Sequence, residues 1–265
     1  MSNYRKINKP LTRVGLEGLL TFLGTGTSTG VPQIGCTCEV CCSQNVKDKR
    51  LRSSVLIDIN NTKILIDAGP DMRQQLLTHQ ISHLNGVLIT HEHYDHVGGL
   101  DDIRPLGETT IYCEHKVMQT IYRTMPYCFS EKKYPGVPRI ELKEITENDF
   151  YLNDIKITPI RVMHAKLPIL GYRIGDFTYL TDVKTMPETS FEKLKGLKIL
   201  IINALRQEEH IAHLNLQDAI EISKKIDAET TYFTHFSHDL GLHDEINKLL
   251  PEKIHLSFDN LSINL

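Results

Sequence analysis

Four potential metal ligands lie within six positions of one segment, THEHYDHVGGLDD, which follows the predicted strand Gly86–Thr90. They are His91, His93, Asp95 and His96. Residues two apart on a strand point to the same side, so the first two histidines can reach one metal. A turn near Tyr94 can present the other pair to a second metal. Imidazole and carboxylate suit Zn²⁺, Mn²⁺ or Fe. The alternative is an exposed polar loop, which requires four ligands to coincide at this spacing by chance.

Three further polar residues each follow an apolar strand and bring the ligand count to what two metal sites need. His164 follows Ile155–Met163, Asp182 follows Phe177–Thr181, and His235 follows Thr230–Thr234. Ligands of open α/β sheets bind beyond the carboxyl ends of the strands, which is where these side chains lie. Taken singly, each one can equally be a buried structural histidine or a capping aspartate. The ordered set favours a binuclear site.

Three cysteines, in GCTCEVCC, have the spacing of a zinc loop. Cys36, Cys38 and Cys41 are close enough for three thiolates to share one tetrahedral zinc. The fourth ligand is missing, and His238 in THFSHD is the first candidate, with His243 second. Four protein ligands leave no position for water, so such a zinc is structural. The alternative is a metal-free cluster of reduced thiols, which would be open to oxidation.

Composition and charge narrow the classes of function. The chain has 265 residues, 40% hydrophobic and 24% charged, and a net charge of -3. A globular protein fits these values, whereas a nucleic-acid partner is disfavoured because there is no basic field to neutralise phosphates. No apolar run reaches the ~18 residues that cross a bilayer, so no membrane association is expected.

The first 24 residues bear on the cellular compartment. Their basic start is followed by a short apolar part broken by Glu17, which indicates no secretion signal and a cytoplasmic protein. Clustered cysteines in such a chain more often hold a metal than form disulfides. Cys42, Cys113 and Cys128 are expected to be free thiols.

The elements that must position these residues are short strands with helices between them. One helix is predicted over Leu216–Ile226 and another around Ile246–Leu250, while Phe129–Pro138 indicates a surface excursion or lid. Asn60–Asn61 and Gly175–Asp176 indicate hairpins. The pattern favours one domain over residues 1–265, with two sheets packed face to face and helices outside. The predicted strands are Leu20–Leu23, Val55–Ile59, Ile64–Asp67, Val87–Thr90, Ile155–Pro159, Tyr172–Ile174, Thr178–Leu180 and Ile199–Ile202.

The order HxHxDH, a lone His, a lone Asp and a final His resembles the metallo-β-lactamase superfamily. This resemblance implies an α/β fold, the four-layer αβ/βα sandwich of two mixed sheets, with a binuclear centre between the sheets. It also implies a ligand set for each metal. The first metal takes His91, His93 and His164, the second takes Asp95, His96 and His235, and Asp182 bridges the two.

A longer set of motifs is similar to a narrower family, the phosphoribosyl 1,2-cyclic phosphate phosphodiesterases of the bacterial carbon–phosphorus lyase pathway. The motifs are LGTGTSTGVPQIGCTCEVC, THEHYDHVGGL, VMHAKLPILGYRI, YLTDV and THFSHD, from Leu23 to the C-terminal SFDNLSI. The resemblance implies zinc on the three cysteines and His238, and suggests a homodimer. It also aligns His213, a neighbour of His210, with the family's general acid.

The expected chemistry is hydrolysis of a small, possibly cyclic, phosphodiester by two divalent metals, Mn or Zn, beside one structural Zn. Such a metal pair supplies an activated water and neutralises the phosphoryl oxygens. Asp95 and His213 are the candidate catalytic residues, and His213 either stabilises the phosphoryl oxygens or protonates the leaving alkoxide. Arg206 is a weak candidate for phosphate binding. Gly24–Gly30, GTGTSTG, lacks the Lys-Ser/Thr ending of a P-loop and is interpreted as scaffold.

Two classes of alternative remain. The first is another hydrolase on the same metals: a tRNA 3′-end nuclease, a lactonase or a thioesterase. The nuclease relatives carry a long basic arm between the positions of His164 and Asp182, where this chain has only 17 residues. The second is a non-catalytic metal or redox module such as a flavodiiron protein. That class usually replaces a central histidine by a carboxylate and adds a flavin domain, and this chain does neither.

Overall fold

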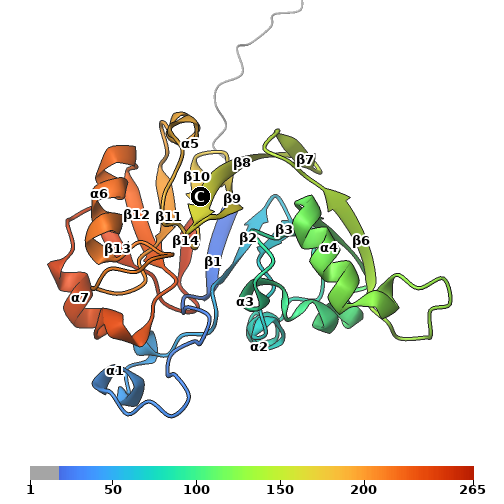
Figure 1. The fold of residues 1–265 in the computed structure, drawn as a ribbon, viewed down its shortest axis with the longest axis horizontal. Coiled ribbons are helices and arrows are strands. Elements are labelled where there is room, and N and C mark those ends of the chain that lie inside the picture. Colours follow the sequence, from blue (N-terminus) through green and yellow to red (C-terminus); the bar gives the residue numbers. More distant parts are fainter. Residues whose placement is uncertain (1–17) are drawn as a thin grey trace, which may run out of the picture.

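Two seven-stranded sheets pack face to face in the computed structural model, which describes residues 18–265 (Figure 1). This arrangement, with helices outside, confirms the expected α/β sandwich. Most of the segment interpreted as lacking a secretion signal lies outside the described residues, so that interpretation and the single domain over residues 1–265 stay predictions. Within residues 18–265, no helix is both long and apolar enough to cross a membrane.

The first sheet has the order β14-β1-β2-β3-β4-β5-β6 and is antiparallel from β14 to β3 and parallel from β3 to β6. The predicted hairpin at Asn60–Asn61 is confirmed, and both residues have positive φ, 52° and 61°, as its tight turn requires. The strands are β1 (Gly18–Gly24), β2 (Ser54–Ile59), β3 (Thr62–Ile66), β4 (Gly86–Leu88), β5 (Glu108–Cys113), β6 (Arg139–Glu144) and β14 (Ser262–Asn264).

The second sheet has the order β13-β12-β11-β10-β9-β8-β7 and is parallel from β13 to β10 and antiparallel from β10 to β7. The hairpin predicted at Gly175–Asp176 joins β9 to β10. The strands are β7 (Phe150–Leu152), β8 (Ile155–His164), β9 (Leu167–Ile174), β10 (Phe177–Tyr179), β11 (Ile199–Asn203), β12 (Thr230–Thr234) and β13 (Ile254–Leu256).

Helices cover the outer face of each sheet. The helix predicted over Leu216–Ile226 is confirmed: the side chain of Asn215 caps its start by accepting from the N–H of Asp218, and the left-handed Asp227 ends it. The α-helices are α1 (Glu39–Cys42), α2 (Met72–Thr78), α3 (Tyr94–Val97), α4 (His115–Thr124), α5 (Glu188–Glu192), α6 (Leu216–Ile226) and α7 (His243–Leu249), and the 3-10 helices are η1 (Val46–Asp48), η2 (Leu100–Leu106), η3 (Pro126–Cys128) and η4 (His238–Leu240).

The core forms three apolar layers. On β2, Val55 and Ile57 face the other sheet, while Leu56 between them packs with the helices outside. On β11, Ile201 faces inward and Leu200 packs with α6 and α7 outside. Because these strands are buried on both faces, they are continuous apolar runs in the sequence. The inner layer fixes the two sheets, so loops at their shared end are held in a constant arrangement.

The loop over 129–138 follows η3 and projects beside the edge strand β6 (Figure 1). Its Gly136 carbonyl accepts a hydrogen bond from Arg104 of η2. The predicted surface excursion is therefore confirmed, and the loop leaves from the edge of the first sheet.

Candidate metal centres

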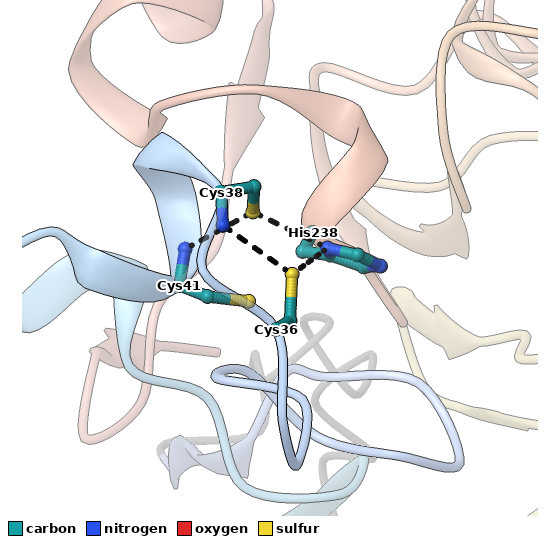
Figure 2. A group of neighbouring side chains, drawn as sticks. All are labelled: Cys36, Cys38, Cys41 and His238. Atoms are coloured by element: carbon teal, nitrogen blue, oxygen red, sulfur yellow. Dashed lines mark hydrogen bonds between the residues drawn. The ribbon is translucent and has the colours of Figure 1, made fainter.

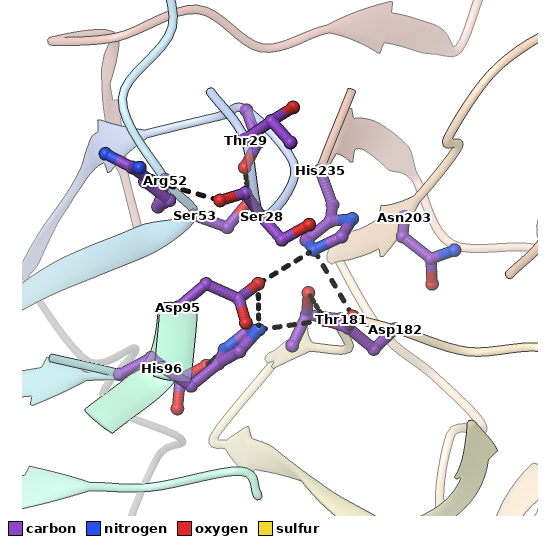
Figure 3. Close-up of polar contacts among 12 residues, drawn as sticks. Ser28, Thr29, Arg52, Ser53, Asp95, His96, Thr181, Asp182, Asn203 and His235 are labelled. Carbon is purple, nitrogen blue, oxygen red and sulfur yellow. Dashed lines mark hydrogen bonds and ion pairs between the residues drawn. The ribbon is translucent and has the colours of Figure 1, made fainter. Parts of the chain in front are cut away.

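The seven residues predicted to hold a binuclear site come together from both sheets, and Figure 3 shows four of them facing one another. We call this set the histidine–aspartate cluster. Its members are His91 and His93 in the loop after β4, Asp95 and His96 on α3, His164 at the end of β8, Asp182 after β10, and His235 directly after β12.

The strand geometry expected for His91 and His93 is wrong. β4 ends at Leu88, because the N–H of Thr90 bonds the Asp67 carboxylate at 2.9 Å instead of a neighbouring strand. The chain leaves the sheet there, and His93 is the N-cap residue directly before α3. The two histidines meet through a loop and not through strand alternation.

His91, His93 and His164 form the first group of ligands. Their ligand nitrogens lie within 4.8 Å of one another, and the rings of His93 and His164 are 5.1 Å apart. The Nδ1–H of His164 donates to the carbonyl of Ala212 at 2.9 Å. That bond leaves Nε2 as the nitrogen with a free lone pair, the form in which imidazole binds a metal.

Asp95, His96 and His235 form the second group, again with ligand atoms within 4.8 Å. Nε2 of His96 is 3.2 Å from Oδ2 of Asp95. On the other side of the His96 ring, Nδ1 lies 2.7 Å from the buried Asp67 carboxylate. Because Asp67 fixes the tautomer and the ring plane, Nε2 is aimed into the cluster.

Asp182 lies between the two groups. Its Oδ1 is 3.2 Å from Nε2 of His235, and its Oδ2 is 3.4 Å from Nε2 of His96. Asp182 and His235 both adopt left-handed backbone conformations, with φ of 57° and 60°. Such conformations are strained for residues with a side chain and persist where surrounding structure imposes them. The position of Asp182 is that expected of a bridging ligand.

Several nitrogens of this cluster are buried without a hydrogen-bond partner. A buried polar atom left unpaired costs about 1–3 kcal/mol, so such a concentration requires another partner. Imidazole nitrogens together with carboxylates are a donor set that divalent cations bind. The residues present therefore fit the metals that were expected. The atoms are Nε2 of His91, Nε2 of His96 and both ring nitrogens of His235, and Nδ1 of the neighbouring His213 is unpaired in the same way.

The two carboxylates of the cluster are ionised beside its imidazoles. Burial raises the pKa of Asp182, but the facing imidazoles of His235 and His96 lower it further, so its pKa lies well below the ordinary value. Asp95 behaves in the same way, because His96 and His235 outweigh its burial. Both carboxylates are thus ionised, and they give the cluster two negatively charged oxygen donors beside its imidazoles.

His213 joins the cluster, whereas His210 and Arg206 do not. Nδ1 of His213 is 3.6 Å from Oδ1 of Asp182, and its ring is 4.5 Å from that of His164. Burial lowers the pKa of His213 to about 3, so it is a neutral imidazole at pH 7. His210 is half-buried, and its Nδ1 accepts from the N–H of Ala212. Arg206 donates to the carbonyls of residues 208 and 209 and so fastens its own loop.

Figure 2 shows the second candidate centre, in which three thiols face one imidazole. Sγ of Cys36 and Sγ of Cys38 each lie 3.3 Å from Nδ1 of His238, and the ligand atoms of all four residues, Cys41 included, lie within 4.8 Å of one another. Hydrogen bonds from the N–H of Cys41 and from His238 lower the pKa of Cys38 to about 6. We call these four residues the thiol cluster. Four converging donors of this kind match a tetrahedral zinc site.

His243, the second candidate for the fourth ligand, lies elsewhere. Its Nδ1 accepts a hydrogen bond from Arg50 at 3.0 Å, so it is not available to the thiols. Cys42 is exposed and Cys113 and Cys128 are buried, all three as free thiols.

Sequence reasoning missed the residues that support the ligands. Asp67 and Thr90 orient His96 and His91, and Thr90 Oγ1 bonds both Asp67 and Nδ1 of His91. Asp67 follows the apolar strand β3 as Asp182 follows β10, so the same signal was present there. Arg50 is also buried, but it does not follow an apolar strand, so nothing in the sequence indicated its position.

Comparisons with known proteins place the chain among related sequences and structures. The sequence model described as the beta-lactamase superfamily domain matches residues 62–236. The crystal structure of a diphosphatase from the PhnP family is 38% identical, with a TM-score of 0.89 over 94% of this chain and 98% of that one. Zn²⁺-bound PqqB from Methylobacterium extorquens is 18% identical, with a TM-score of 0.79 over 93% and 100%, and so shares the fold.

One curated relative carries a different name. An octanoyltransferase of Porphyromonas gingivalis is 44% identical over 246 residues, which cover 91% of this chain and 50% of that protein. The chain thus spans about half the length of this relative.

Proposed function

The chain belongs to the beta-lactamase superfamily and, within it, to the PhnP family, and we propose that it hydrolyses a small phosphodiester with two divalent metals. The family membership confirms the resemblance inferred from the motifs and makes the chain a hydrolase of the metallo-β-lactamase fold. The finer part, a phosphodiester such as a cyclic ribose phosphate, is the proposal.

One observation carries the proposal: the two ligand groups of the histidine–aspartate cluster share Asp182, and His213 lies against the same carboxylate. In this assignment His91, His93 and His164 hold one metal, and Asp95, His96 and His235 hold the other. When bound, such a pair supplies an activated water at neutral pH and neutralises charge on the phosphoryl oxygens. A phosphodiester needs both contributions.

His213 supplies the group that metals do not, a directed N–H. Because its pKa is about 3, the neutral ring can donate one hydrogen bond but has no spare proton at pH 7. Of the two roles expected for it, we therefore propose that it stabilises a phosphoryl oxygen. Protonation of the leaving alkoxide requires a higher pKa.

The proposed substrate is small. The net charge of -3 provides no field for a polymer of phosphates. The 17 residues between His164 and Asp182 form the turn after β8, then β9 and β10. They include no long arm of the kind that tRNA 3′-end nucleases carry at this place. A diphosphate bond is the nearest alternative, because the relative from the PhnP family is a diphosphatase.

An acyl substrate is the second candidate, favoured by the match to the octanoyltransferase. The match covers only half of that protein, so octanoyl transfer can belong to the other half. Thioester hydrolysis by this chain would use the same metals and a different leaving group. An octanoyl thioester is therefore one of the substrates to be compared in the experiment that follows.

The decisive experiment compares turnover by the metal-loaded protein on bis(p-nitrophenyl) phosphate, a cyclic nucleotide, a diphosphate diester, a lactone and an octanoyl thioester. We expect turnover of the phosphodiesters, which Asp95→Asn abolishes and Asp102→Asn retains, since Asp102 is exposed and outside both clusters. Turnover confined to the lactone or the thioester would refute the proposal.

Three further properties are proposed with the function: a cytoplasmic location, a homodimer, and zinc as the metal of the thiol cluster. Light scattering of the purified protein tests the dimer, and metal analysis tests the zinc. A monomer at micromolar concentration would remove the second proposal without affecting the first or third.

A further inference from the structure

Arg50 is a buried cation outside both clusters. Arg50 is only 5% exposed, and its guanidinium donates three hydrogen bonds to buried partners. Nη1 donates to Oγ1 of Thr25 at 2.8 Å and to the carbonyl of Ser257 at 2.9 Å, and Nη2 donates to His243. A buried charge is costly unless it is paired or hydrogen-bonded, so a guanidinium in this position needs a structural or functional reason.

The face of this guanidinium lies over Phe236, with Cζ 4.3 Å from the ring centroid. Phe236 lies between His235, a ligand in the histidine–aspartate cluster, and His238, a ligand in the thiol cluster. Arg50 therefore packs on the one segment, 235–238, that contributes a ligand to both candidate centres.

Segment 235–238 is fastened on the same side by main-chain bonds. The N–H of Phe236 donates to the carbonyl of Thr25, and the carbonyl of Phe236 accepts from the N–H of Thr27. The hydroxyl of Thr25 in turn accepts a hydrogen bond from Arg50 and donates one to the Asp259 carboxylate at 2.7 Å. The guanidinium thus holds the aromatic ring and the strand-like contact that fixes the backbone of this segment.

From these contacts we propose that Arg50 is a positioning residue that couples the two metal centres. It holds segment 235–238 so that His235 faces the histidine–aspartate cluster while His238 faces the thiols. Zinc bound to the thiol cluster would hold His238 in place. Because Arg50 holds segment 235–238, this would favour the position in which His235 can bind a metal of the histidine–aspartate cluster. The proposal rests on the metal sites of the proposed function.

Coupling of this kind has a thermodynamic consequence that does not depend on turnover. If occupation of one centre favours the arrangement that the other needs, loss of the first weakens metal binding at the second. Arg50 acts by geometry, since its flat fork contacts three acceptors and a ring at once, which a lysine ammonium cannot do.

The test measures Mn²⁺ binding to the histidine–aspartate cluster by electron paramagnetic resonance, in protein first treated with a mild chelator that spares tightly held zinc. We expect Cys36→Ser and Arg50→Met each to raise the Kd for Mn²⁺ about tenfold or more. The double variant should have a Kd for Mn²⁺ close to that of whichever single variant has the higher Kd, because both changes release the same segment. Arg50→Lys should restore binding in part.

Arg173→Met is the matched control, because Arg173 is a part-buried arginine bonded to the carbonyls of residues 175, 193 and 195, away from both clusters. It should leave the Kd for Mn²⁺ within twofold. Circular dichroism checks folding, and where Arg50→Met does not fold, Arg50→Lys and Cys36→Ser carry the test.

Two outcomes overturn the coupling: an unchanged Kd in Cys36→Ser that has lost its zinc, or additive effects of Cys36→Ser and Arg50→Met. Failure of the proposed function is distinct from both, because it is seen in the comparison of substrates: a protein that hydrolyses only the lactone or the thioester would still bind Mn²⁺ and still show the coupling.

Discussion

Asp67 accepts a hydrogen bond from Nδ1 of His96 at 2.7 Å, and this bond turns the opposite nitrogen of the ring toward Asp95 and Asp182. The carboxylate is fully buried and also accepts from the N–H and hydroxyl of Thr90. A second-layer carboxylate of this kind orients the ligand and increases its basicity. Asp67 would therefore influence metal binding by His96 without being a ligand itself.

Asp67→Asn keeps the size of the side chain but removes its charge. We expect metal binding at the His96 side to weaken by about 10- to 100-fold, because the imidazole loses its negatively charged partner. Titration with Mn²⁺ measures this, and Asp58→Asn, which removes a half-exposed carboxylate paired with Lys63, is the control. Equal affinities in the two variants would exclude the orienting role.

Much of the fold was predictable because its central strands are apolar and its hairpins carry recognisable turn residues. β1, β2, β3 and β11 and the helix α6 lie where the sequence places them, within a few residues. Two of the missed elements have few buried side chains. β6 is an edge strand, RIELKE, with most side chains exposed, and α4 buries only Val117 and Ile121. β6 therefore shows little apolar alternation, whereas the two buried residues of α4 are four positions apart, a helical spacing that was present in the sequence.

The ligand residues were predictable because their types and order are restrictive, whereas their geometry was not. His91 and His93 were expected to meet by strand alternation, yet the competing bond from Thr90 to Asp67 ends β4 early. That bond joins residues 23 positions apart, and no local pattern reports it. The same holds for Arg50, whose partners come from three distant segments.

The position of His213 predicts how its loss affects substrates. His213→Gln should lower kcat by about 10²–10³-fold, because one preorganised hydrogen-bond donor to the developing charge is lost. As a donor to a phosphoryl oxygen, it should affect a p-nitrophenyl diester and an alkyl diester by the same factor. A loss confined to the alkyl diester would instead assign it to the leaving oxygen.

His210→Gln is the comparison for that measurement. His210 lies with its ring 5.0 Å from that of His213 but takes no part in the ligand groups. We expect its kcat within twofold of the wild-type value. A loss as large as that of His213→Gln would transfer the role to His210.

The thiol cluster predicts one zinc per chain that resists mild chelation. Cys36→Ser should remove it, since the three remaining donors leave tetrahedral zinc incomplete. Cys42→Ser is a closely matched control, because Cys42 directly follows Cys41 but is exposed and outside the cluster. Zinc content by mass spectrometry of dialysed protein distinguishes them. Equal zinc in both variants would contradict the assignment.

His243 predicts a pH dependence of stability. Burial first, and then the charge of Arg50, lower the pKa of His243 to about 4, and its neutral Nδ1 accepts from that guanidinium. In the unfolded chain a histidine titrates near 6.5. As the pH falls from 6.5 toward 4, the unfolded state therefore binds a proton that the folded state does not bind, and the free energy of unfolding decreases.

His243→Asn places an amide oxygen where Nδ1 accepts and removes the titration. The free energy of unfolding of the wild type, relative to that of the variant, should fall by about 2 kcal/mol between pH 7 and pH 5. Urea unfolding of both proteins at each pH measures the difference, and any release of metals at low pH affects the two alike. Parallel curves would mean that His243 takes up its proton as readily in the folded protein as in the unfolded chain, and the bond from Arg50 would then not depend on a neutral ring.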